Sequence, residues 1–266
     1  MHDILETASE AARSAGKLLL SLFGKTTVSE KGASHNLVTE ADGRAEELIV
    51  AFLEREAPGS SFYGEESSAR ARLDAQRLWI IDPLDGTTNY AQQIPHFGVS
   101  IAYAENGALK EGVVYDPVRD ELFSAAAGKG ASCNGKAIAV SRKTLLRESL
   151  IATGFYYDRS VTMEKTLAAL RNLYKADIRC MRRMGAATLD LAWLACGRFD
   201  AYFEYTLSAW DFAAGLLIVR EAGGTADNID GTPAGLFSPG VLCSNGLIHE
   251  EFLRQVRDPG KLTIIR

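Results

Sequence analysis

Two carboxylates that could hold a metal ion lie three residues apart, directly after a short apolar run. Asp82 and Asp85 follow residues 78–81, and Pro83 and a nearby glycine indicate a turn. Ligands bind where the strands of an α/β sheet end, so this turn can direct both carboxylates and the carbonyl of Leu84 at one point. Such hard oxygen ligands suit Mg²⁺, which takes one or two carboxylates plus waters and phosphate oxygens. An ordinary turn is the alternative, but the apolar run before the pair and the two threonines after it favour a metal site.

Two other acidic stretches could complete such a site, but each has a simpler explanation. Glu65 and Glu66 are adjacent carboxylates, which repel each other unless water or a cation is present, and by themselves they fit a solvated loop better. Asp211 follows Trp210 at the start of an apolar segment, and Asp is favoured in the first turn of a helix. The residues alone therefore explain Asp211 equally well as a helix start and as a ligand.

The order Asp82-x-x-Asp85-Gly86-Thr87 invites comparison with haloacid-dehalogenase-type phosphatases, whose nucleophile motif is Asp-x-Asp-Gly-Thr after a strand. This chain has one more residue between its two carboxylates, and Pro83 lies beside the first of them. The extra residue turns the two carboxylates differently, so a mechanism with an aspartyl nucleophile fits poorly.

Taken together, three stretches resemble motifs of the inositol monophosphatase family, which are metal-dependent, lithium-sensitive sugar phosphatases. The stretches are Gly64-Glu65-Glu66-Ser67, residues 79–90, and Trp210-Asp211-Phe212-Ala213-Ala214-Gly215. They occur in the family's order and approximate spacing, and the resemblance covers nearly the whole chain. It implies an α/β (α+β) fold, the layered αβαβα sandwich of the inositol monophosphatase and fructose-1,6-bisphosphatase type. It also implies Mg²⁺-dependent hydrolysis of a phosphate monoester by metal-activated water, with myo-inositol monophosphate converted to inositol and phosphate.

The resemblance implies a role for each matched residue. Two Mg²⁺ ions would be bridged by Asp82, and a third, looser ion would lie beside Glu65. The protein ligands of these ions would be Glu65, Asp82, Leu84 through its carbonyl, Asp85 and Asp211. Asp42 and Thr87 would together activate the attacking water. Phosphate would be held by Gly86, Thr87 and Thr88, and the rest of the substrate by Gly185, Ala186, Ala187, Glu204 and Asp211.

Two further residues, Lys31 and Asn36, precede all of these positions in the chain and also bear on the resemblance. Related enzymes often carry Asp where this chain has Asn36, near the loop assigned to the third ion. The difference at Asn36 therefore bears on the binding of the third ion more than on the hydrolysis reaction. Lys31 matches a residue that is thought to help close the site.

The composition restricts the classes of function. The chain has 266 residues, with 29 Lys and Arg against 34 Asp and Glu, and this net charge of -5 disfavours general binding of nucleic acid or anionic membranes. Four cysteines without a C-x-x-C pair fit reduced thiols and not a zinc site. The N-terminus has the wrong charge for a targeting peptide, and no apolar stretch is long enough to cross a bilayer. We therefore expect a cytoplasmic protein with no membrane partner.

The substrate and the class of function leave alternatives. Relatives with the same metal core hydrolyse fructose-1,6-bisphosphate, histidinol phosphate or 3'-phosphoadenosine 5'-phosphate, but Glu204 and residues 182–187 resemble the inositol-phosphate branch. A regulatory or RNA-associated protein on the same scaffold is the alternative from another class. Arg179, Arg182 and Arg183 form a dense basic patch, which a solvated face or a subunit contact explains equally well. We expect a homodimer that acts on a small phosphorylated polyol or sugar, with its four histidines structural or exposed.

Periodicity predicts the elements that must position these residues. Apolar residues at helical spacing predict helices over 4–22 and 40–56, and residues 78–81 predict a strand that Asp82-Pro83 stops. Residues 97–140 predict a strand meander. Strands near 149–153, 178–181 and 201–205 then alternate with helices near 163–174, 187–195 and 210–222, before a last helix near 249–256. We place a boundary near residue 141, between an N-terminal α+β lobe (1–140) with most metal ligands and a C-terminal α/β lobe (141–266) with the substrate-recognition residues.

Overall fold

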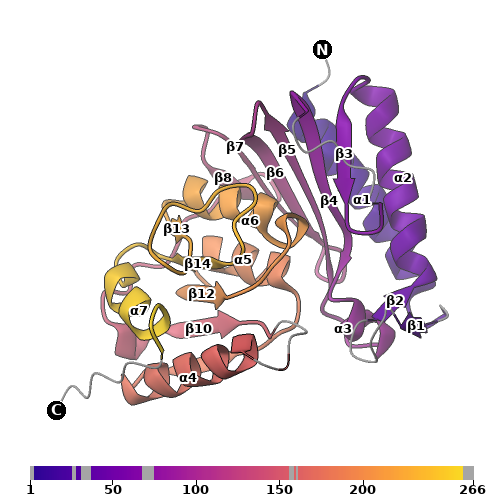
Figure 1. Cartoon of the computed structure of the whole chain (residues 1–266). Helices are drawn as coiled ribbons and strands as arrows, with labels where there is room; N and C mark the ends of the chain where they lie inside the picture. The colour runs from indigo at the N-terminus through magenta and orange to yellow at the C-terminus, as the bar shows by residue number, and fades with distance from the viewer. Residues whose placement is uncertain are drawn as a thin grey trace.

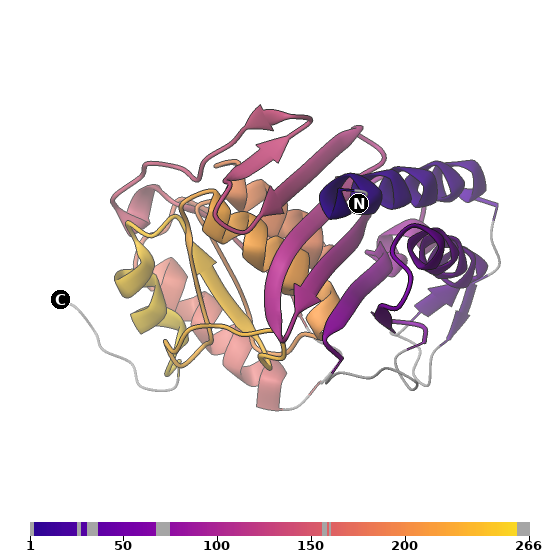
Figure 2. The same ribbon diagram turned by 90° about the horizontal axis from the view of Figure 1, so that it is seen from above.

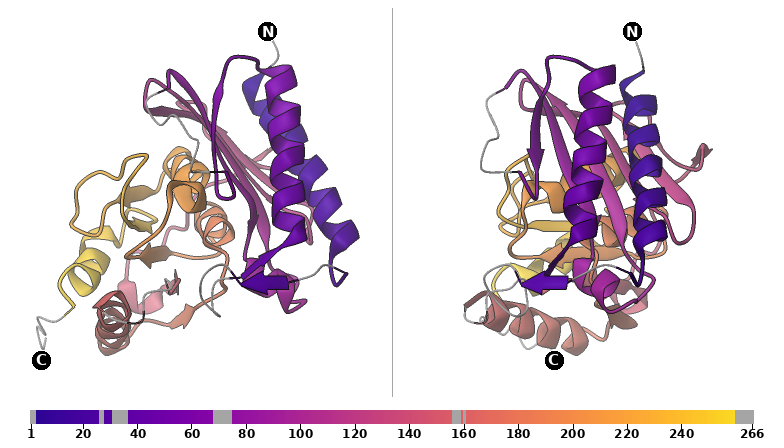
Figure 3. Two further views of the ribbon diagram at one scale, coloured as in Figure 1. Left: turned by 45° about the vertical axis from the view of Figure 1, so that its right-hand side comes forward. Right: turned by 90° about the vertical axis from the view of Figure 1, so that its right-hand side faces the viewer.

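The chain forms five layers, in the order α, β, α, β, α, as the resemblance predicts (Figure 1). The computed structural model describes residues 3–25, 28–30, 37–67, 75–155, 159 and 161–259. The first layer consists of α1 (Ile4–Leu22) and α2 (Glu40–Glu56), which lie side by side on one face of the larger sheet (Figure 3). Both helices have the bounds predicted from apolar periodicity.

The second layer is a seven-stranded sheet in which β3 pairs parallel to β4 and all other neighbours are antiparallel. Its strands, in order, are β3 (Ser61–Gly64), β4 (Arg77–Asp85), β5 (Gly98–Glu105), β6 (Ala108–Asp116), β7 (Glu121–Ala126), β8 (Ala131–Cys133) and β9 (Lys136–Ala137). The predicted meander over 97–140 is confirmed. A separate two-stranded ladder, β1 (Val28–Glu30) with β2 (Leu37–Thr39), precedes α2.

The remaining layers come from the second half of the chain. Helices α5 (Ala187–Ala195) and α6 (Ala209–Glu221) lie between the two sheets (Figure 2). The smaller sheet has the order β11 (Cys180–Arg182), β10 (Leu150–Thr153), β12 (Ala201–Glu204), β14 (Val241–Ser244) and β13 (Thr225–Asp227). Its outer face carries α4 (Val161–Lys175) and α7 (His249–Val256), and the short α3 (Thr87–Ala91) and a 3-10 turn (Leu146–Glu148) complete the elements.

Three clusters of buried side chains explain why the layers stack in this order. Strand β4 is buried on both faces, so Trp79 and Ile81 pack against α1 and α2 while Leu78 and Ile80 pack towards α5 and α6. The central cluster also contains Tyr202 and other residues of the smaller sheet. A third cluster fills the space between that sheet and the helices α4 and α7. A strand buried on both faces reads as a continuous apolar run, which is why β4 is visible in the sequence.

The prediction that Asp82-Pro83 stops this strand is wrong. Strand β4 continues to Asp85, and its pairing with β5 shifts between Asp82, opposite Ser100, and Asp85, opposite Gly98. Three residues of β4 thus span the length of two on β5, which is a β-bulge. Pro83 has no N–H group to pair, so a bulge accommodates it where a regular ladder cannot.

The short strands β3, β13 and β14 were not predicted, because three or four residues show too little periodicity to be recognised. The division near residue 141 stays a prediction, and the central cluster contains residues from both sides of it. Lys31 and Asn36 lie outside the described residues. None of the helices described is long and apolar enough to cross a membrane.

Candidate active site

The bulge in β4 is what brings the two carboxylates of the first motif together. Side chains three positions apart on a regular strand point to opposite faces, but one extra residue restores Asp82 and Asp85 to the same side. The backbone N–H of Leu84 donates to Asp82 Oδ1 at 3.1 Å, which fixes the first carboxylate within the bulge. The second is fixed by α5, because the N–H and the hydroxyl of Thr188 donate to Asp85 Oδ2 at 2.7 and 2.6 Å.

A cavity of about 510 Å³ opens at this end of β4 and reaches across to the C-terminal half of the chain. Every predicted site residue except Asp42 lines it: Glu65, Asp82, Leu84, Asp85, Gly86, Thr87, Thr88, Gly185, Ala186, Ala187, Glu204 and Asp211. Asp211 is confirmed as part of a helix start, since its Oδ2 accepts from the N–H of Ser208 at 2.7 Å in a capping box of α6, and it also lines the cavity. Residues from three separate motifs therefore meet in one place.

The acidic groups of this cavity raise one another's pKa. Burial raises the pKa of Asp82 well above its usual value, and Glu65, Asp85 and Asp211 raise it further. Burial also raises the pKa of Asp85 to about 6, against the lowering effect of the Thr188 hydrogen bonds. The pKa of Asp211 is raised in the same way, by burial first and then by Asp85. Carboxylates gathered like this are stabilised by a cation.

The donor set fits a hard divalent cation. Asp82, Asp85 and Asp211 accept hydrogen bonds from backbone N–H groups and a hydroxyl, and no described Lys or Arg forms an ion pair with them. Within the described ranges, no three His, Cys, Asp or Glu side chains form a closed set of ligands around one point. Mg²⁺ does not need one, because it binds through one or two carboxylates and completes its octahedron with waters and substrate phosphate.

Asp42 lies behind the cavity wall and reaches it through Thr87. It is 1% exposed, and its Oδ2 accepts from the N–H and the hydroxyl of Thr39 at 2.8 and 2.6 Å, in a capping box that begins α2. The hydroxyl of Thr87 lies 3.1 Å from Asp42 Oδ1 and 3.1 Å from the carbonyl of Leu84. A hydroxyl has one proton, so it donates to one of the two at a time. Burial raises the pKa of Asp42, which the bonds from Thr39 and Thr87 oppose.

The turn from β4 into α3 forms the wall assigned to the phosphate. Gly86 has φ of 87°, the left-handed region that favours glycine, and a Cβ there would lie 3.0 Å from the carbonyl oxygen of His96. The N–H of Gly86 also lowers the pKa of Asp85, so that amide is shared with a carboxylate. Asn89 donates to the carbonyl of Met184 at 2.9 Å, which ties α3 to the segment that carries Gly185.

Glu204 lies on β12 in the wall that comes from the C-terminal half. The hydroxyl of Tyr202 donates to its Oε2 at 2.7 Å, and a side chain at Gly154 would collide with its carboxylate. Burial raises the pKa of Glu204 to about 7, although Tyr202 and Arg183 lower it. The predicted basic patch is divided here, because Arg183 lines the cavity while Arg179 and Arg182 do not.

Several residues of the cavity were not predicted from the sequence, namely Gln92, Gly154, Phe155, Arg159, Asp190, Tyr202 and Leu207. Glu46 of α2 was also missed; its Oε2 accepts from the N–H of Glu66 at 2.9 Å and so fixes the turn that carries Glu65. Ser/Thr-x-x-Asp spacing could have indicated the two capping boxes. The other contacts join residues far apart in the chain, which periodicity does not relate.

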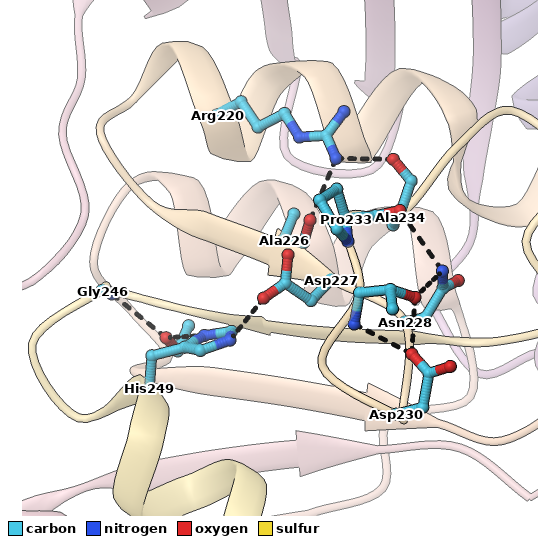
Figure 4. Close-up of polar contacts among 11 residues, drawn as sticks. Arg220, Ala226, Asp227, Asn228, Asp230, Pro233, Ala234, Gly246 and His249 are labelled. Atoms are coloured by element: carbon cyan, nitrogen blue, oxygen red, sulfur yellow. Dashed lines mark hydrogen bonds and ion pairs between the residues drawn. The ribbon is translucent and has the colours of Figure 1, made fainter.

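A Ser-His-Asp set formed by Ser244 of β14, His249 of α7 and Asp227 of β13 has the composition of a catalytic triad. Figure 4 shows the contact between His249 and Asp227. Ser244 Oγ lies 2.9 Å from His249 Nδ1, and Asp227 Oδ2 lies 3.0 Å from His249 Nε2. A catalytic triad has the opposite arrangement, with the serine on Nε2 and the aspartate on Nδ1. Ser244 is fully buried and its Oγ accepts from the N–H of Gly246. The set therefore fastens α7 to β13 and β14, and His249 is structural.

The five layers, with a carboxylate-lined cavity at a strand end, define the class of layered αβαβα proteins of the inositol monophosphatase and fructose-1,6-bisphosphatase type. The chain belongs to the inositol monophosphatase family, whose model matches residues 1–260. An inositol-1-monophosphatase of Synechocystis sp. is 43% identical over 93% of this chain and 86% of that protein. The Nus factor SuhB of Pseudomonas aeruginosa is 42% identical over 92% of each chain. The crystal structure of the extragenic suppressor protein suhB from Bartonella henselae has a TM-score of 0.89 at 37% identity, covering 96% of this chain and 98% of that chain.

Proposed function

We propose that the protein is a Mg²⁺-dependent phosphomonoesterase that hydrolyses myo-inositol monophosphate to inositol and phosphate. The observation that carries this proposal is the position of Asp82, a buried carboxylate in a β-bulge that shares one cavity with Glu65, Asp85 and Asp211. Family membership and an inositol-1-monophosphatase relative support the same reading. Lithium sensitivity, a homodimer and a cytoplasmic location stay predictions.

The metal ligands are assigned as the motifs suggest. Glu65, Asp82 and the Leu84 carbonyl would hold one Mg²⁺, and Asp82, Asp85 and Asp211 a second, with a third ion beside Glu65. Bound Mg²⁺ neutralises the charge of a phosphate monoester, lowers the pKa of water and stabilises the leaving oxygen. The mutual repulsion of these carboxylates supports the assignment, because it is relieved when a divalent cation binds.

Asp42 and Thr87 are assigned the role of removing a proton from the attacking water. When Thr87 donates to Asp42 Oδ1, its oxygen keeps lone pairs that can accept a hydrogen bond from water in the cavity. As Thr87 takes a proton from that water, its own hydroxyl proton would pass to Asp42. The raised pKa of Asp42 makes this carboxylate a stronger base than an exposed Asp. Gly86, Thr87 and Thr88 would then hold the phosphate, and Glu204 a hydroxyl group of the leaving alcohol.

The identity of the ester is tested by measuring phosphate release from a panel of substrates in the presence of Mg²⁺. The panel consists of myo-inositol monophosphate, fructose-1,6-bisphosphate, histidinol phosphate and 3'-phosphoadenosine 5'-phosphate. We expect the highest kcat/KM on myo-inositol monophosphate. A higher value on another ester would keep the phosphatase assignment and replace the substrate, while no hydrolysis of any ester would contradict the proposal.

A regulatory role is the second candidate function, and relatives named Nus factor SuhB favour it. Arg179 and Arg182 are exposed outside the cavity and supply a small basic surface. Binding of RNA by such a surface weakens steeply as salt rises. Salt-dependent RNA binding by a protein without phosphatase activity would place this role first.

A further inference from the structure

One buried carboxyl group in the cavity wall has no role in the scheme above. Asp190 lies in the first turn of α5, is 1% exposed and lines the cavity. Its Oδ1 is buried and accepts no hydrogen bond from the residues that the structure describes. An unsatisfied buried acceptor destabilises a fold, and such groups in native structures call for an explanation. A ligand that donates a hydrogen bond supplies one.

The neighbours of Asp190 show which kind of ligand this wall suits. Burial raises the pKa of Asp190 well above its usual value, Asp85 and Glu204 raise it further and Arg183 opposes them, so these three side chains lie near it. The hydroxyl of Tyr202 already donates its hydrogen bond to Glu204 Oε2 at 2.7 Å. The wall therefore offers two carboxyl groups that accept hydrogen bonds, with one guanidinium group beside them.

A neutral hydroxyl group fits these surroundings better than an anionic group. A second phosphate or a carboxylate on the substrate would meet Asp190 and Glu204, which repel it when ionised. A hydroxyl donates one hydrogen bond to a carboxyl oxygen and brings no charge into the cavity.

We propose that Asp190 is a specificity-determining residue that accepts a hydrogen bond from a hydroxyl group of the substrate's alcohol part, beside the hydroxyl bound by Glu204. The inference rests on the proposed function, because it concerns the polyol part of the same phosphate ester. Two neighbouring carboxyl groups match two hydroxyls of one polyol. Esters of simple alcohols or phenols cannot make these contacts.

The test compares two esters in the Mg²⁺-loaded wild type and in Asp190→Ala. For myo-inositol monophosphate we expect kcat/KM to fall about 10-fold, the effect of losing one buried hydrogen bond. For p-nitrophenyl phosphate, which has no hydroxyl, we expect a change below about 3-fold, because the phosphate contacts are untouched. Asp190→Asn keeps a carbonyl acceptor in place and should recover part of the loss.

A substrate-side measurement identifies the contact directly. In the wild type, one monodeoxy analogue of myo-inositol monophosphate should be hydrolysed with a lower kcat/KM than the parent ester. In Asp190→Ala the same analogue and the parent ester should be equivalent, since the hydroxyl has lost its acceptor. Such non-additivity is the signature of two groups in contact. Additive losses for every analogue would overturn the proposal.

Stability distinguishes recognition from a structural role. Removing an unpartnered carboxyl should leave the Tm of the ligand-free protein unchanged or higher. The matched control is Asp116→Asn, since Asp116 is equally buried but accepts from Arg119 at 2.8 Å and lies outside the cavity. That variant should have a lower Tm and an unchanged ratio of the two kcat/KM values.

Two results separate failure of this inference from failure of the proposed function. An Asp190→Ala protein with a lower Tm and equal losses on both esters would assign Asp190 to the fold and overturn the inference alone. A wild type that hydrolyses neither ester would contradict the proposed function, and the inference with it.

Discussion

Three of the carboxylates that line this cavity, and Asp42 behind its wall, are fixed by short hydrogen bonds from the backbone. Each accepts from an N–H group of a neighbouring turn or helix start, pairing Asp42 with Thr39, Asp82 with Leu84, Asp85 with Thr188 and Asp211 with Ser208. Side chains held in this way lose little conformational entropy when a ligand binds. The pairs three residues apart are readable as capping boxes, whereas the bond between Asp85 and Thr188 spans 103 positions and no local pattern predicts it.

Thr87 and Asp42 can be separated by substitution. Thr87→Val removes the hydroxyl between Asp42 and the cavity, and we expect turnover to fall by about 100-fold or more because general base catalysis contributes at least that much. Asp42→Asn should also lower turnover, with a modest change in the Mg²⁺ concentration required. Steady-state kinetics as a function of Mg²⁺ measures both effects.

Thr39→Ala is the control for the helix that Asp42 also caps. It removes one donor to Asp42 Oδ2 and should cost about 1 kcal/mol of stability, as the loss of an N-cap residue does, while turnover stays near that of the wild type. Loss of Mg²⁺ binding in Asp42→Asn would instead make Asp42 a metal ligand. Full activity in Thr87→Val would remove Thr87 from the mechanism.

The elements matter here mainly at their ends. The apolar run of β4 is readable in the sequence, but the bulge that aligns Asp82 with Asp85 is not, because it depends on the pairing with β5. Strand β3 is only four residues long, yet its last residue, Gly64, leads directly to Glu65. A Cβ at Gly64 would collide with the carboxylate of Glu46, which fixes the following turn.

Gly64→Ala should therefore disturb the Glu65 turn while leaving the rest of the cavity intact. We expect the Mg²⁺ concentration for half-maximal activity to rise about 10-fold, the scale on which groups that orient a metal ligand affect affinity. Gly43→Ala is the matched control in α2, because a Cβ there meets no atom within 4 Å. It should raise stability, since Ala is the better helix former. The same Mg²⁺ requirement in both variants would contradict the role of Gly64.

For the molecule as a whole, periodicity predicts the helices and the meander, and the motifs predict the layered architecture through their resemblance to a family. Neither periodicity nor the motifs predict the order of the strands in either sheet, or the wall that α5 and β12 add to the cavity. Asp190 and Tyr202 lie in segments that read as ordinary buried elements, and only the packing of the two sheets on α5 and α6 brings them to the site.

This buried wall also makes stability depend on pH. The pKa of Glu204 rises from 4.5 to about 7 on folding, so between these values the folded state binds more protons than the unfolded state. Stability then falls as pH rises through this window. In Mg²⁺-free thermal unfolding scans, the wild type should lose Tm relative to Glu204→Gln between about pH 5 and pH 8. An equal or opposite change in the two proteins would contradict the raised pKa.

The central claim is that the carboxylates around Asp82 hold the Mg²⁺ on which hydrolysis depends. The most direct measurement is phosphate release from myo-inositol monophosphate, as a function of Mg²⁺, by the wild type and by Asp82→Asn. We predict Mg²⁺-dependent turnover in the wild type and a loss of about 1,000-fold or more in the variant, whose circular dichroism should be unchanged. Near-normal Mg²⁺-dependent turnover in Asp82→Asn would contradict the claim.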